Sequence, residues 1–269
     1  MRVGFIGAGR MGAPMVRRLS AAGHRVRVLG RSPEKRDAAA QLGAEPVSSA
    51  AEAARDADAV VVCVFTDEQV RQVCLDGDLA AAMTPGAVLI LHTTGSPNTA
   101  AAVAERVAAA GVTVLDAPVS GGPHDVAAGT VTLFVGGDDD AFTRAEPLLS
   151  AYGDPVLHVG PAGAGQKVKL VNNAVFAANI GLVAEAVRLA RRLGVDEPAL
   201  LAALVHGSAA SRALAGIAAT GSTSAFAAAV GEFIGKDVAA VRAAAADLGA
   251  DLGLLDAAAQ AGLRPGQAG

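Results

Sequence analysis

Cysteine is scarce in this chain of 269 residues, which holds only Cys63 and Cys74. Two cysteines are too few for a disulfide framework, and no spacing of Cys and His is typical of a metal site. We therefore expect no bound metal. A low cysteine content without a disulfide framework is typical of proteins from a reducing compartment, and this favours a cytoplasmic location.

Excess charge and aromatic residues are scarce as well. The chain has 22 basic and 26 acidic residues, a net charge of −4, and this balance argues against a general nucleic-acid binder. One Tyr, seven Phe and no Trp leave little for a base-stacking platform. The longest solidly apolar run, residues 59–65, is far shorter than the roughly 20 residues of a membrane helix, and the N-terminus has no signal-peptide profile. Neither nucleic acid nor membrane is an expected partner.

Short β-rich runs alternate with Ala-, Glu- and Arg-rich stretches of helical spacing in the first part of the chain. Several of these runs are apolar throughout instead of alternating, which is typical of parallel strands covered on both faces by helices. The pattern predicts an open, doubly wound α/β sheet. The predicted strands are residues 3–6, 25–29, 59–64, 87–91, 112–115 and 132–135.

A glycine-rich loop lies between the first predicted strand, residues 2–6, and a predicted helix over residues 10–22. In its G-x-G-x-x-G pattern, Gly7 permits a tight turn, Gly9 lets the backbone approach a pyrophosphate, and Gly12 allows close packing of helix and strand. The helix N-terminus adds free N–H groups and positive potential. The alternative is a glycine-rich turn that binds nothing. The predicted dinucleotide-binding residues of this loop are Gly7, Gly9, Arg10, Met11 and Gly12.

The second predicted strand indicates which dinucleotide binds. An NAD-binding domain usually ends this strand with an acidic residue that holds the ribose hydroxyls, but here Leu29 is followed by Gly30, Arg31 and Ser32. Arg31 and Ser32 are suited to a 2′-phosphate, and Ser32 followed by Pro33 also makes a good helix start. The alternative is a solvated basic face beside an ordinary helix cap. We expect NADP(H) to be preferred over NAD(H).

The alternation of strand-like and helical stretches ends at about residue 160, where the segment 160–165 is rich in Gly and Pro. Residues 166–193 then predict one long helix ended by Gly194, and its segment 174–184 is apolar on nearly every face, so we expect a buried interdomain helix. The sequence therefore predicts a Rossmann NAD(P)-binding domain over residues 1–161. An all-helical domain for substrate and oligomer contacts should follow over residues 162–269. So apolar a helix predicts a homo-oligomer, a dimer or tetramer.

Two further segments carry a family resemblance. One runs from Asp116 through Ala-Pro-Val-Ser-Gly to Gly122, and the other from Gly163 through Ala-Gly-Gln-Lys-Val-Lys-Leu-Val-Asn to Asn173. With the opening glycine loop, they resemble the β-hydroxyacid dehydrogenase family, which includes 3-hydroxyisobutyrate dehydrogenases, tartronate semialdehyde reductases and glyoxylate or succinic semialdehyde reductases. The resemblance covers residues 1 to about 240.

Lys169 is the predicted general acid/base. Removing hydride from an alcohol also requires removal of the hydroxyl proton, and a Lys does this if desolvation and a positive helix terminus lower its pKa. Lys169 and Asn173 are four residues apart, on one face of the predicted helix, so Asn173 is placed to orient substrate. In the family the matching Lys is the general acid/base. Lys167 is the expected surface lysine of the pair.

The resemblance implies further contacts to a small carboxylate substrate and the cofactor. Ser120, Gly121 and Gly122 would form a hydroxyl and backbone cradle for the carboxylate, where small residues let N–H groups approach an anion. The alternative is a tight loop without a ligand. By resemblance, Thr94 contacts the nicotinamide side of the cofactor, and Lys236 reaches the cofactor or substrate.

The chain also departs from the family. Leu91 stands where many relatives carry Asp, Arg212 stands where Trp is common, and members usually continue for another helix past the end of this chain. These differences leave the substrate open. The expected activity is hydride transfer between nicotinamide and a small 3-hydroxy acid or short semialdehyde. The alternatives are an imine reductase of the same fold, whose members generally lack the Lys, and a non-catalytic cofactor-binding protein.

Overall fold

The computed structural model describes residues 1–263, except for the side chains of residues 231–233 and 263. Residues 264–269, the end of the predicted helical domain, lie outside this description. The chain divides into two compact units, Met1–Lys169 and Leu170–Gly269, each described by itself below.

The first unit contains a nine-stranded sheet with strand order β3-β2-β1-β4-β5-β6-β8-β7, and β9 pairs with β8. The first six strands of the chain run parallel, while β8 is antiparallel to β6 and β7. The order 3-2-1-4-5-6 is that of a dinucleotide-binding Rossmann sheet, so the predicted fold class is confirmed. The strands are β1 (Arg2–Ile6), β2 (Arg25–Leu29), β3 (Glu45–Val47), β4 (Ala59–Val62), β5 (Val88–Leu91), β6 (Thr113–Asp116), β7 (Val119–Ser120), β8 (Val131–Gly136) and β9 (Gly153–Gly160).

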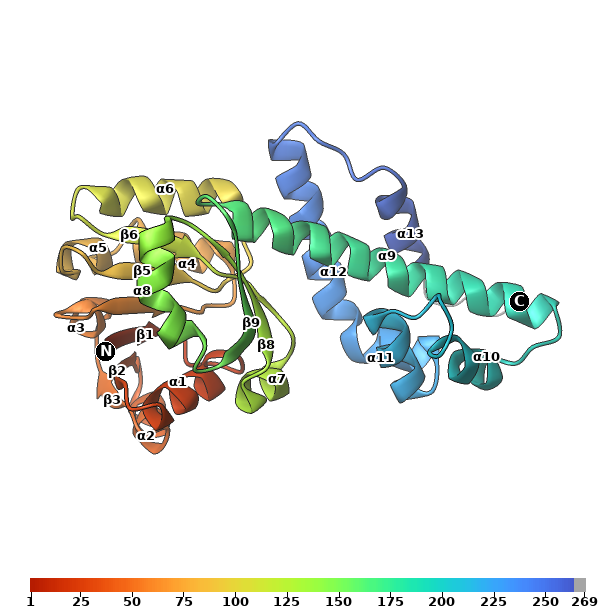
Figure 1. Ribbon diagram of the computed structural model, residues 1–269, viewed down its shortest axis with the longest axis horizontal. Helices are drawn as coiled ribbons and strands as arrows, with labels where there is room; N and C mark the ends of the chain where they lie inside the picture. The colour runs from red at the N-terminus through yellow and green to blue at the C-terminus, as the bar shows by residue number, and fades with distance from the viewer. Residues whose placement is uncertain (264–269) are drawn as a thin grey trace. The chain divides into compact units, whose positions relative to one another are not determined.

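Helices cover both faces of this sheet (Figure 1). One apolar core joins the sheet to α1, α2, α7 and α8, and the other joins it to α3, α4, α5 and α6. The central strands β4 and β5 are buried at every position, which explains why their sequences are apolar throughout. The helices are α1 (Gly12–Ala21), α2 (Pro33–Gln41), α3 (Ala50–Ala54), α4 (Asp67–Cys74), α5 (Leu79–Ala82), α6 (Pro97–Ala108), α7 (Pro123–Ala128) and α8 (Asp139–Leu149).

All six predicted strands are present, but three others were missed. β3 and β7 are only three and two residues long, too short for a pattern to emerge. β9 contains Pro155 and glycine at both ends, and residues of this kind argue against a strand in a sequence. Pro155 lies where the pairing of β9 with β8 is irregular, between the register positions Gly153 and Val156, and a proline is tolerated at such an irregularity.

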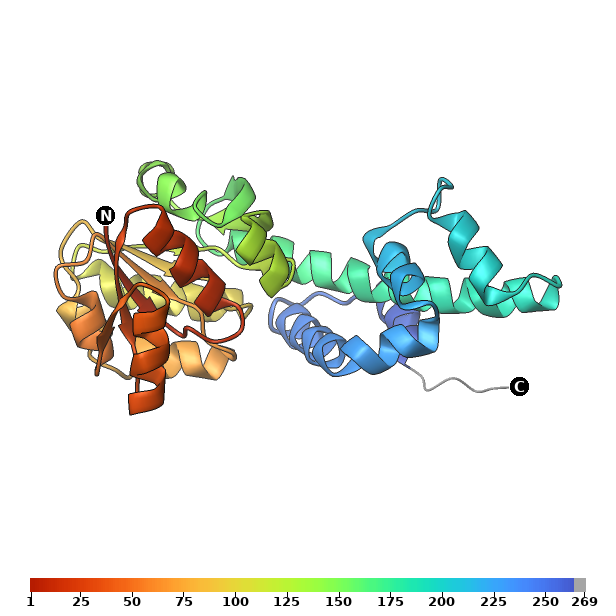
Figure 2. The ribbon, with the colours of Figure 1, turned by 90° about the horizontal axis from the view of Figure 1, so that it is seen from below.

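The second unit is helical (Figure 2). The long helix α9 packs one face against the other helices through Ala177, Ile180, Val183 and Val187. It also approaches α13 so closely that a side chain on Gly181 would meet the backbone of Ala258. The helices are α9 (Ala164–Arg192), which begins in the first unit, α10 (Glu197–Leu204), α11 (Arg212–Thr220), α12 (Thr223–Asp247) and α13 (Leu254–Leu263).

The expected burial of α9 on nearly every face is wrong for the single chain. Val171, Val175, Leu182 and Leu189 are 42–61% exposed. Their separations of 4, 7 and 7 residues place them in one stripe along the helix. The reason is geometric, because the other helices of the unit pack against only one side of α9, so the apolar composition alone overstated its burial.

By length and composition α9 is also apolar enough to cross a membrane, and half of its most apolar window is buried within the chain. Among the described residues, α11 and the first part of α12 pass the same test only as a pair, bent by 103°. Core helices of globular proteins share these properties, so the test alone does not indicate a membrane protein.

Candidate functional site

The loops that carry most predicted site residues leave the same edge of the sheet. Because β1, β2, β4, β5 and β6 run parallel, their carboxyl ends meet at one edge. The strand order reverses between β1 and β4, and open α/β sheets bind ligands in the crevice outside such a switch point.

The glycine loop after β1 has the geometry of a phosphate-binding turn. Gly7 has a φ of 99°, and a side chain there would meet the carbonyl of Cys63. A side chain on Gly12 would meet Gly7 and the ring of Phe5. Packing therefore demands glycine at both positions. An added Cβ on Gly9 would meet nothing within 4 Å, so the space beside this backbone is open to an approaching ligand.

The carboxyl end of β2 borders a hollow of about 200 Å³. Arg31 lines it, and Ser32 caps α2 by accepting the N–H of Lys35 at 3.4 Å, with Pro33 at the first helical position as predicted. Ser32 is also hydrogen-bonded to Glu34, which holds the pKa of that carboxyl below its ordinary value. A phosphate at Ser32 therefore has to compete with an acidic neighbour. The lining residues are Leu29, Arg31, Ser48, Ser49, Ala50, Gln72, Val73, Gly77 and Asp78.

The loop after β5 presents Thr94, which is half-buried. Its neighbour Thr93 is buried and fixes the loop to the end of β4, because its Oγ1 donates to the Val64 carbonyl at 2.9 Å and accepts the Val64 N–H at 3.1 Å. Thr94 therefore follows a residue that is held in place.

The carboxylate of Asp116, at the end of β6, binds the first turn of α9. Its Oδ1 accepts the N–H of Gly163 at 2.6 Å, and its Oδ2 accepts the N–H of Gln166 at 2.7 Å. Because Asp116 is fully buried, desolvation raises its pKa to about 6 despite these donors. The start of α9, which leads to Lys169, is thus attached to the sheet.

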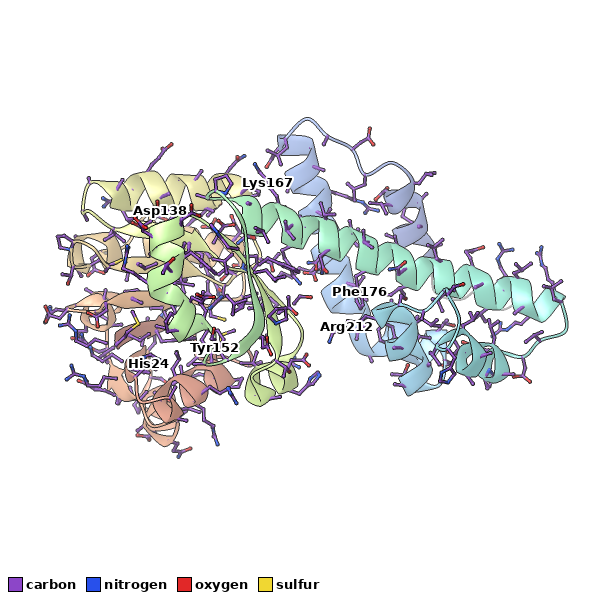
Figure 3. All side chains as sticks on the ribbon, viewed as in Figure 1. His24, Asp138, Tyr152, Lys167, Phe176 and Arg212 are labelled. Atoms are coloured by element: carbon purple, nitrogen blue, oxygen red, sulfur yellow. The ribbon has the colours of Figure 1, made fainter. Side chains whose placement is uncertain are left out.

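The two lysines at the start of α9 differ in exposure. Lys169 is half-buried, whereas Lys167 is exposed, at the beginning of the helix in Figure 3. The sequence predicted this difference. An acid/base group needs a partly desolvated setting, and of the two lysines only Lys169 has it.

Asn173 follows Lys169 by four residues on α9 and is 7% exposed. Its Oδ1 accepts the Asn172 side-chain amide at 3.3 Å, but its own Nδ2 finds no acceptor among the described residues. A buried donor without a partner costs about 1–3 kcal/mol, so native proteins rarely keep one without a reason such as a ligand.

The predicted carboxylate cradle is partly engaged within the chain. The N–H of Gly122 donates to Asp125 Oδ2 at 2.6 Å, which closes the first turn of α7. Gly121 has a φ of 138° and is exposed, and Ser120 is half-buried at the end of β7. An anion at this turn would therefore meet the Ser120 hydroxyl and the Gly121 N–H before that of Gly122.

The residues that depart from the family take ordinary positions. Leu91 is buried at the end of β5. Arg212 is exposed at the first position of α11, after the cap Ser211.

Lys236, predicted to reach cofactor or substrate, is exposed on α12 in the second unit. Among the described residues, no group of His, Cys, Asp and Glu could hold a metal ion.

Two buried polar residues, His92 and Tyr152, are hydrogen-bonded to each other at the start of the loop after β5. The ring of His92 bonds through Nδ1 to the Ala117 carbonyl at 2.6 Å and through Nε2 to the Tyr152 hydroxyl at 2.8 Å. The carbonyl requires the proton on Nδ1, so Tyr152, labelled in Figure 3, donates to Nε2. Burial lowers the pKa of His92 to about 4, and the ring is neutral.

Four residues of this edge were not predicted from the sequence: His92, Tyr152, Asp116 and Gln166. Asp116 and Gln166 lie inside the two family-like segments, so their position in those motifs was an available signal. His92 and Tyr152 are 60 residues apart, and nothing in their local sequence indicates that they meet.

Two family models match the chain. The first, described as the NAD binding domain of 6-phosphogluconate dehydrogenase, matches residues 2–160. The second, described as the NAD-binding domain of NADP-dependent 3-hydroxyisobutyrate dehydrogenase, matches residues 163–266. The chain belongs to the β-hydroxyacid dehydrogenase family. The family resemblance seen in the sequence is thus confirmed.

Relatives in this family differ in substrate and cofactor. The chain is 37% identical over 207 residues to a 3-hydroxyisobutyrate dehydrogenase of Pseudomonas aeruginosa, covering 77% of this chain and 69% of the relative. It is 36% identical over 214 residues to an NAD-dependent L-serine dehydrogenase of the same organism, covering 79% and 72%. The solved 3-hydroxyisobutyrate dehydrogenase of Mycobacterium tuberculosis with L-serine is 34% identical, with a TM-score of 0.85, and the match covers 96% of this chain and 91% of that one.

Two buried titratable groups, His92 and Asp116, predict how the free energy of unfolding responds to acid. Unfolding restores the ordinary pKa of His92, so between pH 6.5 and 4 the unfolded chain binds a proton that the folded chain does not, and stability falls as pH falls. Asp116 acts oppositely between pH 6 and 4, because its folded pKa is the higher one. The two effects offset each other in the wild type.

Replacing His92 by Gln should therefore leave the Asp116 effect alone. From pH 7 to pH 4, the variant should gain on the order of 3 kcal/mol of unfolding free energy relative to wild type. Urea unfolding at each pH measures the difference. A difference that stays constant across this range would contradict the neutral, buried state of His92.

Proposed function

We propose that this member of the β-hydroxyacid dehydrogenase family is an NADP(H)-preferring oxidoreductase. It transfers hydride between nicotinamide and a small 3-hydroxy acid or short-chain semialdehyde. Lys169 is its general acid/base, and the cofactor lies at the carboxyl edge of the sheet.

The observation that carries this proposal is the pairing of chemistry on α9. Half-buried Lys169 is followed one helical turn later by Asn173, whose buried Nδ2 finds no acceptor among the described residues. A substrate hydroxyl or carbonyl oxygen would satisfy that donor and at the same time lie within reach of an amine one turn away. A merely structural asparagine would have been expected to find a partner within the chain.

The residues of the first unit fit a dinucleotide. The open backbone at Gly9 and the α1 N-terminus suit the pyrophosphate, with Arg10 and Met11 in the same loop. The hollow beside Arg31 and Ser32 suits the adenosine end, and Thr94 the nicotinamide end. When bound, the cofactor supplies or accepts the hydride.

The proposed proton transfer uses the neutral amine of Lys169. In the oxidation direction, its Nζ accepts the proton of the substrate hydroxyl as the C–H bond breaks, and in reduction the ammonium returns that proton to the carbonyl oxygen. Asn173 orients the oxygen, and Ser120 with the Gly121–Gly122 turn holds the substrate carboxylate. Lys236 adds a positive charge for the cofactor or the substrate.

Two other functions remain as competing proposals for this fold. An imine reductase would turn over a cyclic imine and none of the aldehydes. A non-catalytic binding protein would bind NADPH and turn over nothing. A panel of glyoxylate, succinic semialdehyde, methylmalonate semialdehyde and a cyclic imine, followed by NADPH oxidation, separates these possibilities.

Lys169→Ala should reduce kcat by about 10²- to 10⁴-fold, the usual contribution of a general acid/base, while the Kd for NADPH stays nearly unchanged. Lys167→Ala is the matched control, an exposed lysine on the same helix turn, and should keep wild-type kcat. Kinetics with the fastest panel aldehyde and NADPH fluorescence titration measure both. Activity of Lys169→Ala within a few-fold of wild type would remove the assignment.

Arg31→Ala should weaken NADPH binding by roughly 10- to 100-fold, because a charge-assisted hydrogen bond to the 2′-phosphate is lost, and should leave NADH binding nearly unchanged. Arg25→Ala, an exposed arginine at the opposite end of β2, is the control. Dissociation constants of both cofactors for the three proteins test this. Equal weakening of NADPH and NADH would argue against the preference for NADP(H).

We also propose a homo-oligomer in the cytoplasm. The oligomer is supported by the exposed stripe of Val171, Val175, Leu182 and Leu189 along α9, since contiguous apolar surface of this kind is typical of protein interfaces. The cytoplasmic location stays a prediction from the low cysteine content.

Replacing both Leu182 and Leu189 by Glu should shift the protein toward the monomer, because burying the introduced carboxylates in an interface is unfavourable. Leu254→Glu, at an 89% exposed position on α13, makes the same change away from the stripe and should keep the wild-type mass. Sedimentation equilibrium measures the masses. A wild-type protein that is monomeric at micromolar concentration would contradict the oligomer.

A further inference from the structure

The buried side chain of Gln166 joins α9 to the loop after β5. Its Nε2 donates to the Thr93 carbonyl at 2.8 Å, and its Oε1 accepts the Gly95 N–H at 3.0 Å. The residue is 2% exposed. Both partners flank Thr94, so one amide holds the loop on each side of that residue.

The backbone of Gln166 is held at the same time by Asp116. The carboxylate binds the N–H groups of both Gln166 and Gly163, so the end of β6 is attached to the first turn of α9. Asp116 and Gln166 together form one connected set of hydrogen bonds, which we call the buried clamp. It links β6, α9 and the loop after β5.

Close packing leaves the buried clamp little room to move. A Cβ added to Gly136, at the end of β8, would lie 2.6 Å from Asp116 Oδ1 and 2.7 Å from the Gly165 nitrogen. A Cβ on Gly165 would meet the carbonyls of Asp116 and Phe134. Backbone therefore lies directly against backbone where α9 begins, and this close packing leaves no room for a side chain at Gly136 or Gly165.

We infer that Asp116 and Gln166 are positioning residues, which set where Lys169 stands relative to Thr94 through the buried clamp. Lys169 follows Gln166 by three residues, so the two are neighbours along α9. A displacement of about 1 Å at a reacting group costs on the order of 10²-fold in rate, so the clamp acts on catalysis without touching substrate. This inference rests on the proposed role of Lys169.

Gln166→Leu and Gln166→Glu test the clamp by different routes. The Leu variant loses both side-chain hydrogen bonds, and its kcat should fall by on the order of 10²-fold while the Kd for NADPH stays within about two-fold of wild type. The Glu variant can still accept from Gly95, but donates to the Thr93 carbonyl only while its carboxyl is protonated.

The Glu variant should therefore regain activity at low pH. Burial and the facing carbonyl raise the pKa of the introduced carboxyl, so the ratio of its kcat to that of wild type should be highest near pH 5 and fall as pH rises. Wild type is the reference because Asp116, whose pKa is about 6, also titrates in this range. The same ratio for the Leu variant should show no such rise, because Leu has no proton to offer.

A double-mutant cycle separates positioning from general stability. If Gln166 acts through Lys169, adding Gln166→Leu to Lys169→Ala should lower the residual kcat no further. Asp116→Asn should resemble Gln166→Leu, because its amide presents an N–H to one of the two backbone donors. Asp138→Asn is the control, since Asp138 accepts the Ala141 N–H at 2.9 Å in the same way at the start of α8, where Asn caps equally well.

The outcomes are distinct. Wild-type kcat in both Gln166 variants, or additive losses in the cycle, would overturn the positioning role while leaving Lys169 as acid/base. Full activity of Lys169→Ala would overturn the proposed function and the inference that rests on it. If Gln166→Leu does not fold, the pH ratio of the isosteric Glu variant decides, and a flat ratio would count against the clamp.

Discussion

A buried carboxylate at the end of a central strand determines much of the architecture of this protein. Asp116 has no access to solvent, and an anion in that position is tolerated only if hydrogen-bond donors surround it. The donors are the first N–H groups of α9, which lack partners within their own helix. The carboxylate at the strand end and the N–H groups at the helix start therefore satisfy each other's hydrogen bonds, and this fixes where α9 begins.

The chemistry proposed for this protein depends on that attachment. A parallel sheet gathers its loops at one edge, but loops are the mobile parts of a fold, and a reaction needs fixed geometry. Here the loop after β5 is tied to β4 by Thr93 and to α9 by Gln166, and it rests on the neutral pair of His92 and Tyr152. In the proposed function, buried polar groups that do not contact the ligand thus hold in place the loop that does.

Two loops at this edge have donors that are already engaged within the chain. At the carboxyl end of β2, Arg31 lines the hollow, and Ser32 is hydrogen-bonded to the Lys35 N–H and to Glu34. In the proposed function, a 2′-phosphate at this position would meet one basic and one acidic neighbour. At the Ser120 turn, the Gly122 N–H donates to Asp125, so this N–H is not available to the substrate carboxylate that the proposed function places there. The relatives include a 3-hydroxyisobutyrate dehydrogenase and an L-serine dehydrogenase, so family membership alone does not fix the substrate.

The sequence by itself determined six strands of the sheet, the glycine loop, the long helix, the family and the difference in exposure between Lys167 and Lys169. These follow from local patterns, because apolar runs, glycine spacing and short motifs act within one segment of the chain. Only the tertiary structure decided that α9 keeps an exposed apolar stripe, that β9 joins the sheet despite Pro155, and that Gly122 is engaged by Asp125. It also decided that Asp116 and Gln166 meet, because contacts between residues 50 positions apart depend on how the elements pack, which no local pattern contains.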